Sequence, residues 1–484
     1  MLINYQPISK IIGALLVLLG FTMFATAGIS AAYNDTDWDS FLISGAITAG
    51  FGGLLWAYKF SHSNAIGKRE GYLIVALGWV MMALFGSLPF MISGVSSSFT
   101  DAFFESMSGF TTTGASIFTD IESLPHGILF WRSLTHWIGG MGIIVLTVAL
   151  FPLLGIAGIE LFVAESPGPT ADKIHPRIKE TAKRLWFIYL GLTVLLYLLL
   201  WAEGMTGFDA INHAFATMGT GGFSTKNASI AYYPSATIQY TLILFMFIAG
   251  CNYAVIYYLL KGNFKKVWIN EEFRYYSLFI LVTALILGLW INFMVDGSYE
   301  KNFRDGLFQL VSLITTTGFV TADYTKWSPG LNMFFFMMLF LGACAGSTAG
   351  GIKFVRHMVF VKNTYLEFKR ILHPRAIVRI KINKEVVAPR VLTHILVFLL
   401  VYLLLFVGAT LIITIIGMDF MTTLGGVATT LGNVGPSIGN LGPVNNFAEV
   451  PESAKWVFSS LMLLGRLELF TVLILFTPFF WRNN

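Results

Sequence analysis

Apolar runs of about 20 residues recur along the whole chain, and they constrain its fold more than any other feature. Examples span residues 11–31, 42–60 and 73–95. A helix needs roughly this length to cross a hydrocarbon core about 30 Å thick. Because 56% of the residues are hydrophobic and only 12% are charged, the composition excludes a soluble globular protein. We therefore expect an all-α integral membrane protein whose first apolar run is a retained helix.

Basic residues gather in the connections between apolar runs and predict the orientation of the chain. They cluster at residues 59–69, 173–184, 261–274 and 353–390. Loops rich in Lys and Arg stay on the cytoplasmic side of a membrane, so the net charge of +5 does not indicate a nucleic-acid partner. The sequence predicts a multi-pass protein surrounded by lipid, with cytoplasmic N- and C-termini.

Four segments of the chain share one pattern. Each begins with an aspartate, continues as a helix-compatible stretch, ends in a Thr/Gly-rich run and has long apolar stretches on both sides. The separations 114−101, 222−209, 318−305 and 432−419 all equal 13, and a threonine stands two residues before each glycine. The aspartates are Asp101, Asp209, Asp305 and Asp419, and the glycines are Gly114, Gly222, Gly318 and Gly432.

This repetition predicts four helix–pore loop–helix repeats around one pore, preceded by an N-terminal helix pair, with ten spanning helices in all. About ten residues of helix reach only half-way across a bilayer. Non-helical backbone at that depth is tolerated where it is buried in protein or lines water. The expected units are residues 1–68 (helix pair), 69–165, 166–262, 263–375 (with an intramembrane loop) and 376–484.

The Thr-x-Gly pattern suits the chemistry of a cation that sheds its water. Rings of backbone carbonyls replace that water without a fixed charge that would trap the ion, and glycine permits the backbone angles that turn carbonyls toward an axis. We expect each aspartate to cap its half-helix, so that the negative helix end faces the pore. The predicted filter residues are Thr111, Thr112, Thr113, Gly114, Gly219, Thr220, Gly221, Gly222, Thr315, Thr316, Thr317, Gly318, Thr429, Thr430, Leu431 and Gly432.

On these segments the sequence resembles the Trk/Ktr/HKT superfamily of K⁺ transporters, and within it the TrkH branch, over nearly its whole length. The resemblance implies K⁺ as the permeant ion, one filter glycine per repeat and no organic cofactor. In relatives that pass Na⁺ more readily the first glycine is commonly serine, so Gly114 favours K⁺. It also implies a protein that is not an enzyme and that lies in the bacterial inner membrane.

The same resemblance implies a gate. In the family a glycine-rich loop breaks the helix after the third filter and obstructs the pore, and an arginine of the last helix faces that loop. The matching residues here are Gly346, Ser347, Thr348, Gly350, Gly351, Lys353 and Arg466. The implied partners are a second copy, in a homodimer with one pore per subunit, and TrkA, a cytosolic nucleotide-binding regulatory subunit that docks on the basic loop 353–390.

Several alternatives remain open on the sequence alone. Small residues also serve helix packing, and an H⁺- or Na⁺-coupled K⁺ symporter is the rival mechanism. The loop near Lys353 lacks the spacing of a phosphate-binding loop, and Arg466 could pair with Glu468 only for assembly. An intramembrane enzyme would draw on His136, His213 or Glu105, but the histidines are expected to be packed, and Glu105 is expected to add negative potential near the pore entrance.

Overall fold

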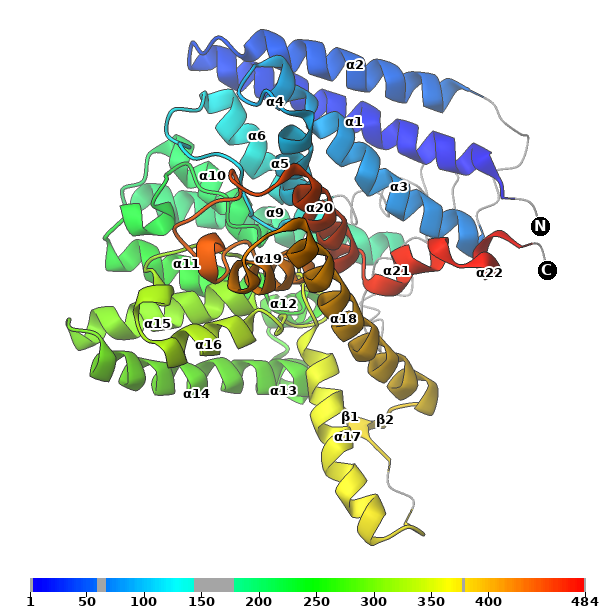
Figure 1. Cartoon of the computed structure of the whole chain (residues 1–484), viewed down its shortest axis with the longest axis vertical. Helices are drawn as coiled ribbons and strands as arrows, with labels where there is room; N and C mark the ends of the chain where they lie inside the picture. The colour runs from blue at the N-terminus through cyan, green and yellow to red at the C-terminus, as the bar shows by residue number, and fades with distance from the viewer. Residues whose placement is uncertain (1–2, 59–66, 143–177, 377–378, 483–484) are drawn as a thin grey trace.

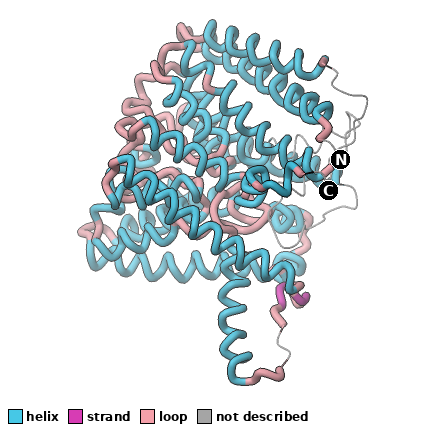
Figure 2. The backbone as a smooth tube through the Cα atoms, turned by 45° about the vertical axis from the view of Figure 1, so that its right-hand side comes forward, coloured by secondary structure: helices cyan, strands magenta, loops and turns pink. Residues whose placement is uncertain are grey.

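The computed structural model describes residues 3–58, 67–142, 178–376 and 379–482 (Figure 1). Lys59, Lys173 and Arg177 of the predicted cytoplasmic loops, and the boundary expected at residues 165/166, lie outside these ranges. Within them helix dominates, and the two strands form a single small antiparallel pair (Figure 2).

The helices follow the order in which the repeats were expected. The first part of the chain holds α1 (Tyr5–Ala32), α2 (Trp38–Ala57), α3 (Lys68–Gly86), α4 (Leu88–Ile92), α5 (Phe99–Phe110), α6 (His126–Trp137) and the π-helical turn η1 (Ile138–Gly142). The middle holds α9 (Ile178–Ala202), α10 (Gly207–Met218), η2 (Ser229–Tyr232), α11 (Ala236–Ala249), α12 (Tyr253–Leu260), α13 (Phe264–Ile269), α14 (Glu271–Met294), α15 (Tyr299–Ile314), η3 (Tyr324–Lys326), α16 (Pro329–Met338) and α17 (Phe354–Leu372).

The last part begins with the strand pair and ends in a series of short helices. It holds β1 (Lys381–Ile382), β2 (Glu385–Val386), α18 (Pro389–Ile416), α19 (Phe420–Gly432), η4 (Gly439–Leu441), α20 (Glu452–Arg466), α21 (Leu469–Leu473), η5 (Ile474–Phe476) and α22 (Pro478–Trp481).

Six helices in the described ranges are long and apolar enough to cross a membrane, or up to eight if each of two bent pairs counts as one span. The bent pairs are α11–α12, at 108°, and α20–α21 with η5, at 115°. The described residues therefore contain six to eight of the ten spanning helices expected from the sequence, and residues 143–177 lie outside them. The helix that follows the third pore segment is also broken, since α16 has only 10 residues before a non-helical loop. After the first pore segment, α6 continues into the π-helical turn η1, where the described range ends.

The N-terminal helices α1 and α2 lie side by side (Figures 1 and 2) because small residues let their backbones approach. A Cβ built on Gly13 would lie 2.6 Å from the Gly52 carbonyl oxygen, and one built on Gly52 would lie 2.7 Å from that of Gly13. Close contact through glycines is a usual way for membrane helices to associate, since lipid supplies no hydrophobic force between them.

The apolar core has two halves. One half joins the N-terminal pair with α3, α5 and α6 and with α18–α21. The other joins α9–α12 with α14–α16. In terms of the expected repeats, the first packs with the fourth and the second packs with the third. The last residues of the half-helices belong to these cores, Phe110 and Leu431 to the first and Met218 and Ile314 to the second.

The half-helices α5, α10, α15 and α19 contain 12, 12, 16 and 13 residues. Each is too short to span a bilayer and ends among buried residues. Only Asp419 is an N-cap, accepting a hydrogen bond from the Thr422 N–H at 3.0 Å. The capping positions of the other three are Ser98, Thr206 and Ser298, so the cap predicted for Asp101, Asp209 and Asp305 is wrong.

Helix α17 projects from the body of the molecule, and the β1–β2 pair lies on the connection from α17 to α18, which packs along the body (Figures 1 and 2). The two chain ends lie beside the start of α3. There the Asn4 N–H donates to the Glu70 carboxylate at 3.0 Å, and Arg69 donates to the Arg482 carbonyl at 2.7 Å.

Candidate ion pore

The four half-helices end in segments with one backbone conformation. In each, a residue with φ near +54° is followed by one intervening residue and then by a glycine with positive φ. The first residues are Thr112, Thr220, Thr316 and Asn433, and the glycines are Gly114, Gly222, Gly318 and Gly435, with φ of 78°, 80°, 78° and 100°. Side chains other than glycine rarely adopt such angles, which explains the glycine in each segment.

The fourth segment differs from the sequence-based prediction by three residues. Thr429, Thr430, Leu431 and Gly432 belong to α19, which continues to Gly432. The conformational counterpart of Gly114 is Gly435, so the aspartate-to-glycine separation here is 435−419 = 16 and not 13. The assignment of Thr429–Gly432 to a non-helical filter segment is therefore wrong. The helix ends only at Gly432, because the next residue, Asn433, adopts the left-handed conformation, which asparagine tolerates.

The four glycines form a closed series of contacts. A Cβ built on Gly114 would overlap the Gly221 carbonyl oxygen, and one on Gly222 would overlap that of Thr317. The same holds for Gly318 against Val434. A Cβ on Gly435 would lie 2.7 Å from the Thr113 carbonyl oxygen, which returns the series to the first segment. Segments more than 300 residues apart thus meet in one ring of backbone, which we call the glycine ring (Gly114, Gly222, Gly318 and Gly435).

The side chains next to the ring glycines differ from one segment to the next. In the first and third, neighbouring threonine hydroxyls lie 2.8 Å apart, Thr111 with Thr113 and Thr315 with Thr317. In the second, Gly221 stands where the others carry Thr113 and Thr317, and the His136 ring occupies the adjacent space.

The residues in the left-handed position also differ in their contacts. The Asn433 amide donates to Thr113 Oγ1 at 3.0 Å and to the Met462 carbonyl at 2.8 Å. The Thr112 hydroxyl is buried and has no protein partner among the described residues. A buried hydroxyl without a protein partner is available to a ligand.

On one side the ring opens into a cavity of about 160 Å³, lined by all four ring glycines and by Asn227. The Asn227 amide donates to Asp120 at 2.9 Å. This hydrogen bond holds the pKa of Asp120 below its usual range, and the carboxylate is therefore ionised at neutral pH. Asp120 does not line the cavity itself, but its neighbours Thr119 and Ile121 do, and a negative group so near a cavity attracts cations.

On the other side of the ring lies the loop that joins α16 to α17, residues 342–353. It is not helical, and Gly346 and Gly351 have φ of 73° and 67°. The buried Glu272 carboxylate accepts hydrogen bonds from the Ala345 and Val355 N–H groups at 2.8 and 3.1 Å. These bonds fix the base of the loop to the start of α14.

The tip of the loop contacts the pore segments. The Gly350 N–H donates to Thr316 Oγ1 at 2.7 Å, and Thr348 donates to the Met218 carbonyl at the end of α10 at 3.1 Å. A Cβ on Gly350 would lie 2.8 Å from that of Asn433. The loop is therefore packed against the ends of three half-helices, while the Lys353 ammonium bonds to the Ala349 carbonyl within the loop.

Arg466, the last residue of α20, joins the loop to the first repeat. Its guanidinium donates to the Thr348 carbonyl at 2.7 Å and to the Gly139 and Gly140 carbonyls at 2.5 and 2.8 Å. Arg466 thus contacts the loop that the sequence analysis placed opposite it. Glu468, the partner considered in the assembly alternative, forms an ion pair with Arg356 of α17, at 2.5 Å.

Two further sequence interpretations concern residues behind the ring. His136 and His213 are fully buried and packed, as expected. Glu105 is also fully buried, but it forms an ion pair with Arg132 at 2.8 Å. The expectation that it adds negative potential at the entrance is wrong because the arginine compensates its charge. Arg132, Asn433, Gly435 and Glu272 were not identified from the sequence.

Known proteins resemble the chain over its full length. A family model named TrkH, described as a cation transport protein, matches residues 39–483. The chain is 42% identical to the Trk system potassium uptake protein TrkH of Escherichia coli K12, over 99% of this chain and 100% of that protein. It is 32% identical to the TrkG protein of the same strain, over 99% of each. The crystal structure of the potassium transporter TrkH from Vibrio parahaemolyticus superposes with a TM-score of 0.89 at 39% identity, covering 99% of this chain and 100% of that one.

Proposed function

This chain belongs to the TrkH family of cation transport proteins, and from that premise we propose that it takes up K⁺ through a channel-like pore at the glycine ring. Relatives with 40–42% identity are named potassium uptake proteins. The observation that carries the proposal is the closed ring, since four positive-φ glycines pack on one another's neighbouring carbonyls. Carbonyl dipoles gathered at one axis are the ligands that replace the water of a K⁺ ion.

We assign the filter to residues 111–114, 219–222, 315–318 and 432–435. The first three ranges are those predicted from the sequence, and the fourth replaces 429–432. Thr112 would add a hydroxyl ligand at the end of the ring nearer the gate, because its hydroxyl lacks a protein partner among the described residues. The half-helices direct their negative ends toward this region, which favours a cation.

We assign the gate to the loop 342–353 together with Arg466. The loop contacts the ends of α10, α15 and α19, and it obstructs the path below the ring. Arg466 holds it closed by donating both to the loop and to η1. A positive charge placed there also opposes a cation, and its own burial is stabilised by the three carbonyls.

The partners and location are part of the same proposal. The projecting helix α17 carries a face of strongly exposed apolar side chains, which fits a helix that packs on a second copy of the chain in a homodimer. Its exposed members are Val361, Tyr365, Phe368, Ile371 and Leu372. The basic connection between α17 and α18 would lie in the cytoplasm, where TrkA would dock, and the protein would span the bacterial inner membrane.

Reconstitution tests the function directly. The purified full-length protein in planar bilayers is expected to give unitary K⁺ currents, with a reversal potential in mixed K⁺ and Na⁺ that favours K⁺. Gly114→Ser is the informative variant, because its side chain would press on the Gly221 carbonyl, and it is expected to lower the K⁺ current and raise the Na⁺ share of what remains. K⁺ movement that requires an H⁺ or Na⁺ gradient would replace the channel-like mechanism by a symporter, and a protein that moves no K⁺ under any gradient would end the proposal.

A further inference from the structure

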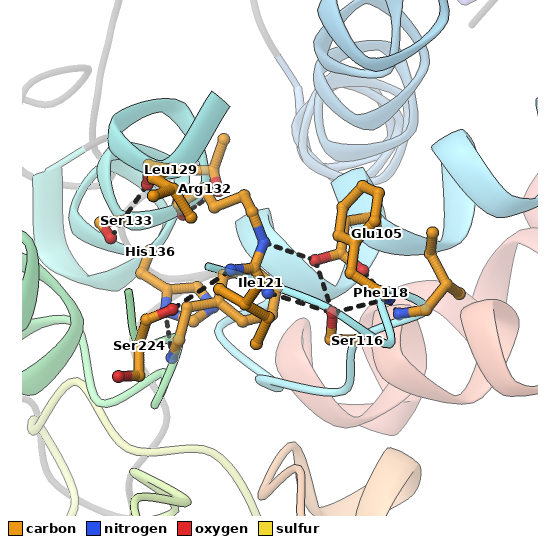
Figure 3. A network of polar contacts seen from close by, with 12 residues as sticks. Glu105, Ser116, Phe118, Ile121, Leu129, Arg132, Ser133, His136 and Ser224 are labelled. Carbon is orange, nitrogen blue, oxygen red and sulfur yellow. Dashed lines mark hydrogen bonds and ion pairs between the residues drawn. The ribbon is translucent and has the colours of Figure 1, made fainter. Parts of the chain in front are cut away.

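Behind the outer end of the ring, a buried ion pair joins the first two pore segments (Figure 3). Glu105 lies on the half-helix α5 and Arg132 lies on α6, and they are 0% and 1% exposed. The Arg132 Nε donates to Glu105 Oε1 at 2.8 Å. Arg132 is among the residues that line the cavity outside the glycine ring, whereas Glu105 is not.

Glu105 ties the outgoing chain of the first segment back to its own half-helix. Its Oε2 accepts a hydrogen bond from the Ile117 N–H at 2.9 Å, and its Oε1 accepts one from the Ser116 hydroxyl at 3.1 Å. Ser116 stands two residues after the ring glycine Gly114. The position of that glycine therefore depends on the Glu105 carboxylate.

Arg132 carries the connection into the second segment. It donates to Ser116 Oγ at 3.0 Å and to the Ser224 carbonyl at 3.3 Å, and Ser224 stands two residues after Gly222. The guanidinium also lies over the Phe223 ring, 4.1 Å from its centre. One planar group thus contacts the chain that leaves two adjacent ring glycines, a geometry that a guanidinium provides and an ammonium does not.

The second and third repeats place a histidine and a glutamine at the same register, and the fourth places Gly426 there. Glu105, His213 and Gln309 each stand nine residues before their ring glycine, since 114−105, 222−213 and 318−309 all equal 9. His213 lies 2.9 Å from Ser224 Oγ, so it braces its own segment in the way Glu105 does. In the described residues, the first repeat alone has an ion pair at this register, and its arginine also contacts the second repeat.

We infer that the Glu105–Arg132 pair is a positioning element that fixes the distance between Gly114 and Gly222 and thereby sets which cation the pore prefers. The inference rests on the proposed function, because it assigns the two residues an effect on ion selection. A carbonyl ring discriminates between cations only while the spacing of its oxygens is maintained. Loosening one of the four sides should admit Na⁺ without closing the pore.

The experiment measures K⁺/Na⁺ permeability ratios from reversal potentials of the full-length protein in bilayers. Glu105→Gln keeps the shape of the side chain and removes its charge, and Arg132→Lys keeps the charge and removes the planar fork. Each is expected to lower the ratio by about tenfold, while K⁺ current persists. Asp101→Asn is the matched control, because the Asp101–Lys455 ion pair joins α5 to α20 and does not reach the ring.

The outcomes separate the two proposals. If the wild-type protein carries no K⁺ current, the proposed function fails. If the wild type selects K⁺ and both variants stay within about twofold of its ratio, the positioning role alone is overturned. A general loss of stability is distinguished by the control, since Asp101→Asn should lower thermal stability and leave the ratio unchanged. If Glu105→Gln does not fold, Arg132→Lys decides the question.

Discussion

The first and fourth pore segments are neighbours in the glycine ring and reach one backbone conformation from different sequences. The first is Thr-Thr-Thr-Gly and the fourth is Gly-Asn-Val-Gly, yet Thr112 and Asn433 have φ of 53° and 54°. They contact each other directly, because Asn433 donates to Thr113. The shared requirement is thus the backbone geometry, and the side chains that enforce it can vary.

The support behind the two segments differs accordingly. The first is braced by a buried ion pair between α5 and α6. The fourth is braced by close packing, since a Cβ on Gly465 of α20 would overlap the Leu431 carbonyl and Asn433 donates to the Met462 carbonyl. A charged brace depends on solvent exclusion, whereas packing depends on volume. Substitutions should therefore affect the two segments in different ways.

The largest expected effect comes from Gly435→Ala. The positive φ costs about 1–3 kcal/mol with a side chain, and the new Cβ would press on the Thr113 carbonyl. We expect K⁺ flux in liposomes to fall by about 100-fold. Gly432→Ala should be milder, because Gly432 ends a helix and has no positive φ. If Gly432→Ala lowered flux more than Gly435→Ala, the filter glycine of the fourth segment would be Gly432, as the sequence predicted.

Arg466→Ala removes the link by which the last helix holds the gate loop against the first repeat. Three hydrogen bonds from a charged donor are lost. We expect K⁺ flux to rise by about tenfold, because the loop is released. Lys326→Ala, at an exposed site outside the gate, serves as the control. An unchanged rate for Arg466→Ala would assign this arginine to assembly.

The pair Thr112→Ala and Asn433→Ala separates ion contact from structural support. Thr112 has no protein partner in the described residues, so its loss should cost less than about 1 kcal/mol of stability and lower K⁺ flux about threefold. Asn433 makes two buried hydrogen bonds, so its loss should cost about 2 kcal/mol. Denaturation in detergent and flux at matched protein amounts measure both. Equal stability losses would contradict the distinction.

The smallest effect on transport is expected from Asp101→Asn, at the outer start of the first half-helix. It weakens the ion pair with Lys455, which joins the first repeat to the fourth. Lys455 retains its hydrogen bond to the Ala448 carbonyl, so the cost should be about 1–2 kcal/mol. We expect flux to stay within about twofold of the wild type. A larger change would mean that the outer ends of these repeats influence the ring.

The sequence predicted three of the four ring segments because Thr-x-Gly at fixed spacing is a local signal. It failed for the fourth because Thr430-Leu-Gly432 has the same pattern and the same spacing from an aspartate. Asp419, however, is the N-cap of its helix, whereas Asp101 and Asp209 lie three positions further on, within the first turn of theirs. The signal that was missed is Asn433-Val-Gly435, since asparagine tolerates the left-handed region better than other residues.

Contacts between distant segments were beyond sequence reasoning. Glu105 was noted, but the partner that decides its role, Arg132, lies 27 residues away on another helix. Glu272 anchors a loop more than 70 residues further along the chain. Sequence periodicity does not reveal such pairs, because tertiary packing determines which side chains are buried and which of them come into contact. The break after the third pore segment was expected from the family resemblance, whereas the bends at α11–α12 and α20–α21 were not, since apolar composition continues through them.

The glycine ring is built from a single polypeptide, and this has a consequence for how the protein can change over evolution. In an assembly of four identical chains, one codon change would alter every side of the ring together. Here a mutation alters one side, as the difference between Thr112 and Asn433 illustrates. The sequence of each pore segment can thus diverge while the other three segments maintain the pore. The protein can therefore acquire asymmetric features one substitution at a time.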